Sequence, residues 1–97
     1  MSAAPRAVPT VQIDNEQLRV TRWRFAPGAT TGFHRHDYAY VVVPLTTGRL
    51  ATTGPAGDGV AELVAGVSYF RPAGIEHDVR NANAFEFVFV EIELKTA

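Results

Sequence analysis

The chain has 97 residues, 46% of them hydrophobic and 20% charged, a composition that excludes a disordered protein and fits one compact domain. Nine basic and ten acidic residues give a formal net charge of -1 without a basic cluster, which argues against nucleic acid as a partner. Cysteine is absent, so any metal ion would have to be held by histidine and carboxylate side chains.

The N-terminal residues contain two prolines and several alanines but no apolar run of signal-peptide length. We predict that residues 1–10 form a flexible arm and that residues 11–97 form a single domain. The longest apolar runs, around 41–45 and 87–90, are far shorter than the ~20 residues that cross a bilayer as a helix. We therefore expect a soluble, cytoplasmic protein with no membrane partner.

From residue 11 onward, β-branched and aromatic residues recur in short runs separated by Pro, Gly, Asn and Asp, a pattern typical of strands and turns. No segment shows the period of an amphipathic helix. We predict an all-β fold, and many short, closely spaced strands indicate a sandwich or a barrel. The predicted strands cover residues 11–14, 18–25, 39–45, 49–53, 60–64, 67–70, 78–80 and 85–94.

The last predicted strand is apolar on both faces in its first half. One face carries Phe85, Phe87 and Phe89, and the other carries Val88, Val90, Ile92 and Leu94. A barrel interior would cover one face, and a second sheet or a partner subunit would cover the other. Because so short a barrel gains stability from burial between subunits, we expect a homodimer.

The three histidines of the chain are the candidate metal ligands. His34 and His36 are two residues apart, so on an extended strand their side chains point the same way and can hold one ion together. His77 follows a Pro-Ala-Gly turn, residues 72–74, which would direct the next strand back into the barrel. Three imidazoles leave a coordination position open for water or substrate, as expected of a reactive site.

Two segments around these histidines resemble the two motifs of the cupin family. The first motif, G-x5-H-x-H-x3,4-E-x6-G, is matched by Gly28, His34, His36 and Gly48. The second motif, G-x5-P-x-G-x2-H-x3-N, is matched by Gly66, Pro72, Gly74, His77 and Asn81. The resemblance covers residues 28–48 and 66–81, and it implies a single cupin β-barrel, also described as a double-stranded β-helix or jelly roll.

One family ligand is missing. The motif's glutamate position holds Val41 in the register that also fits Gly48, or Tyr40 in the shorter register. Several cupin oxygenases are similar in using three histidines alone. The resemblance therefore implies one divalent transition metal ion, Fe, Ni, Zn or Mn, held by the three histidines.

Four residues are candidates for a pocket beside the metal. Tyr38 and Tyr40 could hydrogen-bond a bound ligand, although aromatic residues on strands more often fill a core or an interface. Arg71 could clamp an anionic substrate, although exposed arginines usually do not. Val41 stands at the family's glutamate position in the register that also fits Gly48.

Two functions fit this set of residues. The first is a metal-dependent, dioxygenase-like enzyme that binds a small oxygen-bearing substrate and either activates dioxygen or polarises a carbonyl. The second is a non-catalytic module that binds or senses a small molecule, a reading that Val41 at the ligand position favours slightly. Both functions take a small molecule as the ligand.

Overall fold

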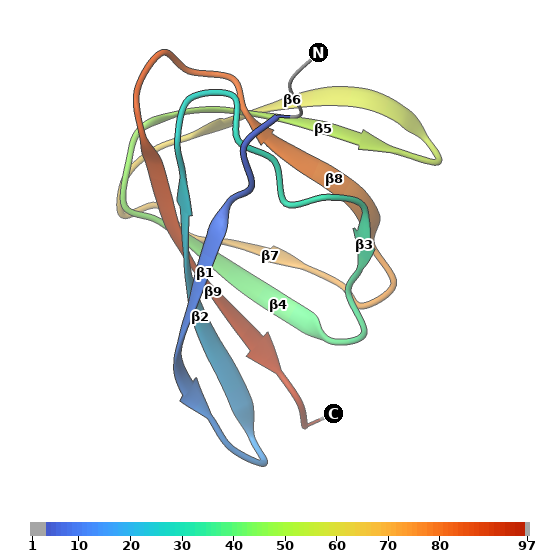
Figure 1. Cartoon of the computed structure of the whole chain (residues 1–97). Helices are drawn as coiled ribbons and strands as arrows, with labels where there is room; N and C mark the ends of the chain where they lie inside the picture. The colour runs from blue at the N-terminus through green and yellow to red at the C-terminus, as the bar shows by residue number, and fades with distance from the viewer. Residues whose placement is uncertain (1–3, 97) are drawn as a thin grey trace.

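The chain folds into β-strands. In the computed structural model, which describes residues 4–96, these residues form nine strands and no helix, which confirms the predicted all-β fold (Figure 1). The strand runs are rich in β-branched and aromatic residues, which fit a pleated, half-buried surface. The strands are β1 (Val8–Asp14), β2 (Leu18–Phe25), β3 (His34–Arg35), β4 (Ala39–Pro44), β5 (Gly48–Gly54), β6 (Gly57–Leu63), β7 (Tyr69–Arg71), β8 (Glu76–Asn81) and β9 (Phe87–Leu94).

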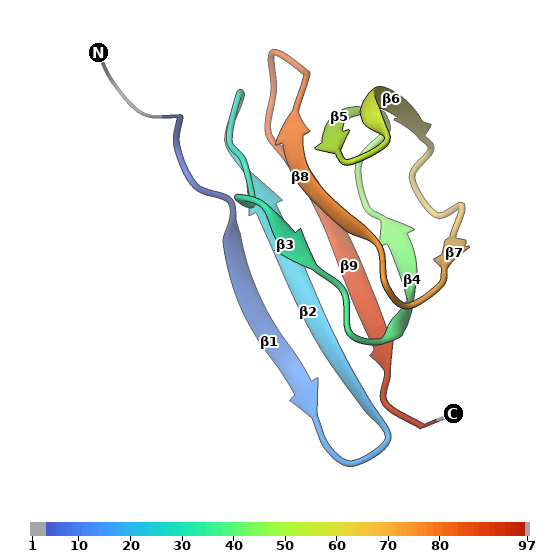
Figure 2. The same cartoon turned by 90° about the vertical axis from the view of Figure 1, so that its right-hand side faces the viewer.

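The strands form two antiparallel sheets that face each other. The five-stranded sheet has the order β1-β2-β9-β4-β7, and the four-stranded sheet has the order β3-β8-β5-β6. Figure 2 shows β3 and β8 in front of β2 and β9. The chain passes repeatedly from one sheet to the other, which is the arrangement of a double-stranded β-helix.

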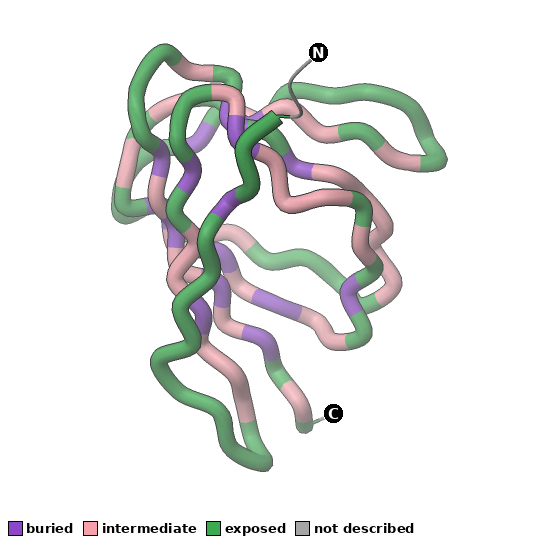
Figure 3. Tube along the Cα trace, viewed as in Figure 1, coloured by how far each residue is buried: buried purple, intermediate pink, exposed green. Residues whose placement is uncertain are grey.

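The core lies between the sheets, and β9 runs through its centre. Phe87 and Phe89 of β9 pair in register with Phe25 and Trp23 of β2. Phe25 and Phe87 are fully buried, and Leu50 of the other sheet is also buried. Figure 3 shows buried positions recurring along the inner strands, whereas β1 is exposed throughout. This aromatic packing fixes the position of β9 and of the side chains that follow on the same face.

The strand bounds differ from the predicted ranges by up to three residues, and two of the differences have clear physical reasons. The strand His34–Arg35 was not predicted, because two residues make no recognisable apolar run and the strand exists through its pairing with β8. Strand β9 begins at Phe87 instead of residue 85, and Phe85 is 49% exposed. The expectation that Phe85 shares the buried face of Phe87 and Phe89 is therefore wrong.

The segment predicted as an N-terminal arm, residues 1–10, makes backbone contacts where the structure describes it. Ala7 N donates a hydrogen bond to Thr30 O over 2.9 Å, and Thr30 N donates to Pro5 O over 2.9 Å. Strand β1 begins at Val8, inside the predicted arm, and pairs with β2. Residues 1–3 of the predicted arm lie outside the described residues.

Candidate metal centre

Pairing between β3 and β8 sets two of the histidines side by side. His34 and His77 are register partners, and directly paired residues on antiparallel strands project from the same face. His36 follows β3 and is held by the turn before β8. Its backbone N donates to Ile75 O over 2.8 Å, and its carbonyl accepts from Gly74 N over 2.8 Å. Gly74 has a φ of 94°, which glycine adopts without strain.

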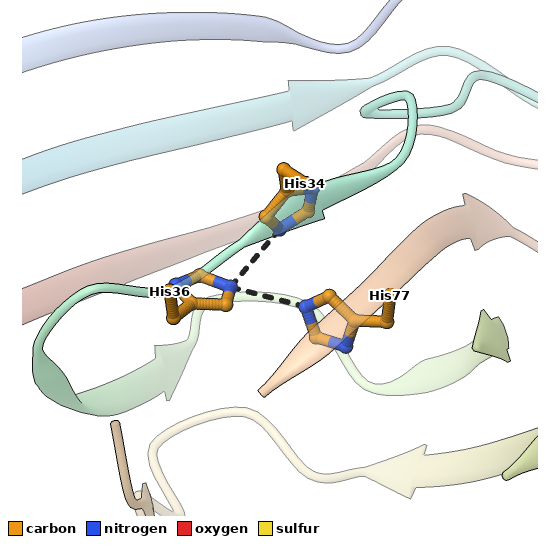
Figure 4. Close-up of side chains that lie close together, drawn as sticks. All are labelled: His34, His36 and His77. Carbon is orange, nitrogen blue, oxygen red and sulfur yellow. Dashed lines mark hydrogen bonds between the residues drawn. The ribbon is translucent and has the colours of Figure 1, made fainter. Parts of the chain in front are cut away.

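The three imidazole rings converge inside the barrel (Figure 4). His36 Nε2 lies 2.9 Å from His34 Nε2 and 3.0 Å from His77 Nε2. Each pair of rings meets edge-on, and one nitrogen of each ring lies within 4.8 Å of a nitrogen of the other two. The structure thus brings together the three side chains that the motif spacing singled out.

The hydrogen bonds around His34 define which of its nitrogens is free. His34 Nδ1 lies 2.9 Å from the carbonyl oxygen of Gly32, which can only accept, so Nδ1 carries the proton and Nε2 presents a lone pair in the neutral ring. His36 Nε2 has a single in-plane position and cannot form linear hydrogen bonds to both neighbours at once. A cation would take the lone pairs of all three nitrogens together, so this donor set fits a divalent transition metal ion.

The protonation of the cluster is set by its burial. Desolvation, together with the nearby imidazoles of His34 and His77, lowers the pKa of His36 to about 4. Desolvation, followed by the His34 imidazole and the Arg71 guanidinium, likewise lowers the pKa of His77 to about 4. Both rings are therefore neutral at pH 7, and the neutral ring is the form that binds metal.

Tyr40 and Val41, the two residues that share the family's glutamate position, point to opposite faces of β4. Tyr40 is buried, and its ring stacks on that of His36 with 4.0 Å between centroids and an interplanar angle of 23°. Burial raises the pKa of Tyr40 far above its usual value, so its hydroxyl stays protonated. Val41 is half-buried on the outer face of the sheet, where it pairs with Phe70 and Ile92.

A cavity of about 50 Å³ adjoins the histidine cluster. Its polar lining includes His34, His77 and Glu91, and Tyr40 lines it as well. A volume of this size holds a few waters or one small molecule. The remaining walls are mostly apolar and aromatic, so the cavity can exclude bulk water from a bound ligand.

Of the four candidate pocket residues, Tyr40 alone is among the described residues that line this cavity. Tyr38 is half-buried elsewhere on the chain. The Arg71 guanidinium lies over the Tyr69 ring, 4.6 Å from its centroid, and donates a hydrogen bond to Phe70 O over 3.3 Å. Tyr38, Val41 and Arg71 therefore lie outside the cavity.

Two buried carboxylates beside the cluster were missed by the sequence analysis. Glu91 and Glu93 follow Phe87 and Phe89 on the inner face of β9, because alternation continues along the strand. Each is only 8% exposed, and their carboxylates lie within 4.8 Å of each other and of a ring nitrogen of His36. Side chains alternate between the two faces of a strand, and this alternation along residues 87–93 was a signal for the two glutamates. The prediction for this strand considered only its apolar residues.

The two carboxylates differ in how their charge is compensated. Glu93 accepts two hydrogen bonds from the Arg19 guanidinium, over 2.8 Å and 3.0 Å. Glu91 forms no ion pair with the residues that the structure describes. Burial, together with the nearby charge of Glu93, raises the pKa of Glu91 to about 7, against weaker opposing effects of the Arg19 guanidinium and the Trp23 indole.

The fold and the site together define a small, single double-stranded β-helix with a three-histidine cluster at an internal cavity. Residues 21–93 match the family model of the cupin domain, and the chain therefore belongs to the cupin family.

Known proteins are similar to this chain over its whole length. The β-alanine degradation protein BauB of Pseudomonas aeruginosa is 63% identical over 95 residues, which cover 98% of this chain and all of that protein. The crystal structure of a cupin domain from Bordetella pertussis is 56% identical, with a TM-score of 0.97 over 99% of this chain and 100% of that one. A cupin superfamily protein from Desulfitobacterium hafniense, 16% identical with a TM-score of 0.73, covers 99% of this chain and 84% of its own, and shares the fold.

Within residues 4–96, no helix is long and apolar enough to cross a membrane.

Proposed function

We propose that this protein is a metal-dependent cupin enzyme that acts on a small oxygen-bearing molecule. In this proposal His34, His36 and His77 hold one divalent transition metal ion, Fe, Ni, Zn or Mn. The observation that carries it is the convergence of three Nε2 atoms, separated by 2.9 Å and 3.0 Å from the central one, beside a cavity. A bound ion would supply Lewis-acid or oxygen-activating chemistry there.

The surrounding residues would prepare the site for that chemistry. The carbonyl of Gly32 fixes the tautomer of His34 and aims its Nε2 at the centre, as outer partners of metal-binding histidines do. The ring of Tyr40 packs on His36 and restricts its rotation. The apolar walls of the cavity would keep bulk water away from a bound substrate.

The name of a relative suggests the chemical context. The Pseudomonas protein is named for the degradation of β-alanine, and it is aligned with nearly all of this chain at 63% identity. We infer that this protein acts on β-alanine or on a small molecule derived from it. The cavity of about 50 Å³ supports a ligand of this size.

A non-catalytic binding or sensing module is the second candidate function. It is favoured by the absence of the family's carboxylate, whose position is filled by the phenol of Tyr40 on the inner face and by Val41 on the outer face. In this case the cavity would bind its small molecule without turnover.

The test of the metal site is elemental analysis of protein purified without an affinity tag. We expect close to one transition metal ion per chain after reconstitution, and less than about one tenth of that in His77→Ala. No stoichiometric metal in the reconstituted parent protein would refute the site. Turnover of β-alanine and related small acids by the loaded protein would then separate the enzyme from the binding module.

We also infer a homodimer through the outer face of the five-stranded sheet. An apolar row crosses all five strands there, because the register pairs each member with the next. The row consists of Ile13, Val20, Ile92, Val41 and Phe70. Its ends, Ile13 and Phe70, are 49% and 56% exposed, so the row presents apolar surface that a second copy would bury.

A further inference from the structure

The cavity beside the histidines holds a buried carboxylate that forms no ion pair with the residues described. Glu91 lines this cavity, is more than nine-tenths buried, and forms no ion pair within residues 4–96. Its neighbour Glu93 is equally buried, but Arg19 binds both of its oxygens. A buried carboxylate without a partner is costly to keep ionised, so a cationic ligand group would be strongly favoured next to Glu91.

The walls around Glu91 are suited to a cation. Trp23 and Phe89 line the same cavity, as do Tyr40, whose ring stacks on His36, and Tyr69, whose ring is covered on one face by the Arg71 guanidinium. The faces of aromatic rings carry negative electrostatic potential, and they attract ammonium groups most strongly where water is excluded. The Glu91 carboxylate beside the rings of Trp23 and Phe89 is therefore a favourable environment for an alkylammonium ion.

The cavity wall has a second polar group, the indole of Trp23, with which a ligand could form a hydrogen bond. The indole Nε1 of Trp23 is buried and forms no hydrogen bond of good geometry among the described residues, although it is close enough to the Glu91 carboxylate to lower the pKa of that group. An apolar molecule would offer no further partner to this donor or to the Glu91 carboxylate, whereas a polar ligand could satisfy both. The cavity is thus better matched to a ligand that carries polar or charged groups than to a hydrocarbon.

The carboxylate and the histidines are close enough to meet one small molecule. His34, His77 and Glu91 line the same cavity of about 50 Å³. The Glu91 carboxylate lies within 4.8 Å of a ring nitrogen of His36. We propose that Glu91 binds the protonated primary amine of a small amino acid whose carboxylate end faces the histidine cluster. The orientation of the carboxylate end rests on the proposed function, whereas the amine site does not.

The amine site can be tested by comparing ligands that differ only at one end. β-Alanine and propionate share the carboxylate, and propylammonium carries the amine without it. Titration calorimetry on the metal-loaded protein is expected to show β-alanine binding at least about tenfold more tightly than propionate. The Glu91→Gln variant is expected to reduce this preference to less than about twofold, with the affinity for propionate nearly unchanged.

Matched variants give the control. Glu86→Gln removes a carboxylate whose side chain is half exposed, and it should leave the amine preference unchanged. Glu91→Asp keeps the charge but withdraws it by one methylene, so an intermediate preference is expected. If Glu91→Gln fails to fold, as judged by circular dichroism, the preference for β-alanine over propionate is measured in Glu91→Asp instead. An unchanged preference for β-alanine in a folded Glu91 variant would overturn the proposal.

Two further results separate this inference from the proposed function. Binding of propylammonium to metal-free protein, lost in Glu91→Gln, would support the amine site even if the histidines hold no metal. If the protein binds one metal ion per chain but has equal affinities for β-alanine and propionate, the metal centre is supported and the amine site is refuted. A metal content that falls in Glu91→Gln but not in Glu86→Gln would assign Glu91 to the metal and would also refute the amine site.

Discussion

The ring of Tyr40 stacks on the ring of His36, with 4.0 Å between the centroids. The inner position that the family motif gives to a glutamate is thus filled by an aromatic side chain in contact with a member of the histidine cluster. Because β4 alternates, Tyr40 and not Val41 occupies the inner face of the strand. The shorter motif register, which aligns Tyr40 with the family's glutamate, is therefore the register that corresponds to the inner face.

Replacement of Tyr40 by glutamate tests this register. We expect Tyr40→Glu to return a carboxylate to the cluster and to raise the affinity for a divalent metal ion by about tenfold or more. Val41→Glu, one residue along and on the outer face, should leave metal affinity unchanged. Competition with a coloured chelator measures both. Stronger binding in Val41→Glu would mean that β4 has a different register in solution.

Acidification is expected to release the metal ion later than it would from exposed histidines. Burial lowers the pKa of His36 and His77 from 6.5 to about 4, so these rings stay neutral well below pH 6.5. Protons compete with the metal only when they bind the free ligands, so affinity should be nearly unchanged down to about pH 5 and should fall mainly between about pH 4 and pH 3. Chelator competition across this range gives the profile. An affinity that stays flat to about pH 3 would exclude the histidines as the principal ligands.

Glu91 is expected to destabilise the metal-free protein at neutral and alkaline pH. Its pKa is raised from 4.5 to about 7, so the folded state holds a proton that the unfolded state releases between these values. The free energy of unfolding is not reduced by this group below about pH 4.5, where Glu91 is protonated in both states. It decreases as the pH rises from 4.5 through 7, because the unfolded state releases the proton first. The free energy of unfolding of Glu91→Gln should therefore exceed that of the parent protein by about 1 to 3 kcal/mol at pH 8, and the difference should vanish near pH 4.5.

Urea unfolding at both pH values measures this difference. Glu86→Gln is the control, since its carboxylate is half exposed. A gain in Glu91→Gln that is equal at pH 8 and pH 4.5 would indicate a packing effect instead of a buried charge.

The motif spacing predicted the histidine cluster but not the acid beside it. His34, His36 and His77 were found because two residues on one strand share a face and the third follows a recognisable turn. Glu91 was missed because an acidic residue on a strand is usually exposed, and its burial depends on β9 lying between β2 and β4. That sheet order depends on long-range pairing, which the local pattern of this chain does not encode.

Asn81, the last position of the second motif, illustrates a motif residue with a structural role. Its buried side-chain amide donates to the carbonyls of Phe25, Ala26 and Phe85, over 3.1 Å, 3.3 Å and 2.8 Å. Its Oδ1 accepts from Asn83 N over 2.9 Å. Asn81→Leu should lower the free energy of unfolding by about 2 to 4 kcal/mol, because it leaves buried backbone groups without partners. Metal stoichiometry in the folded fraction should not change, and a loss of metal without a loss of stability would contradict the structural role.

The apolar row on the outer face of the five-stranded sheet predicts how the dimer can be broken. Ile92 lies in the middle of the row, between Val20 and Val41. A charge buried at the centre of an interface without a partner is strongly unfavourable, so Ile92→Arg should convert the dimer to a monomer. Val60→Arg is the matched control, since Val60 is 65% exposed on β6 of the other sheet. Sedimentation velocity measures the state, and an Ile92→Arg variant that sediments like the parent protein would move the interface elsewhere.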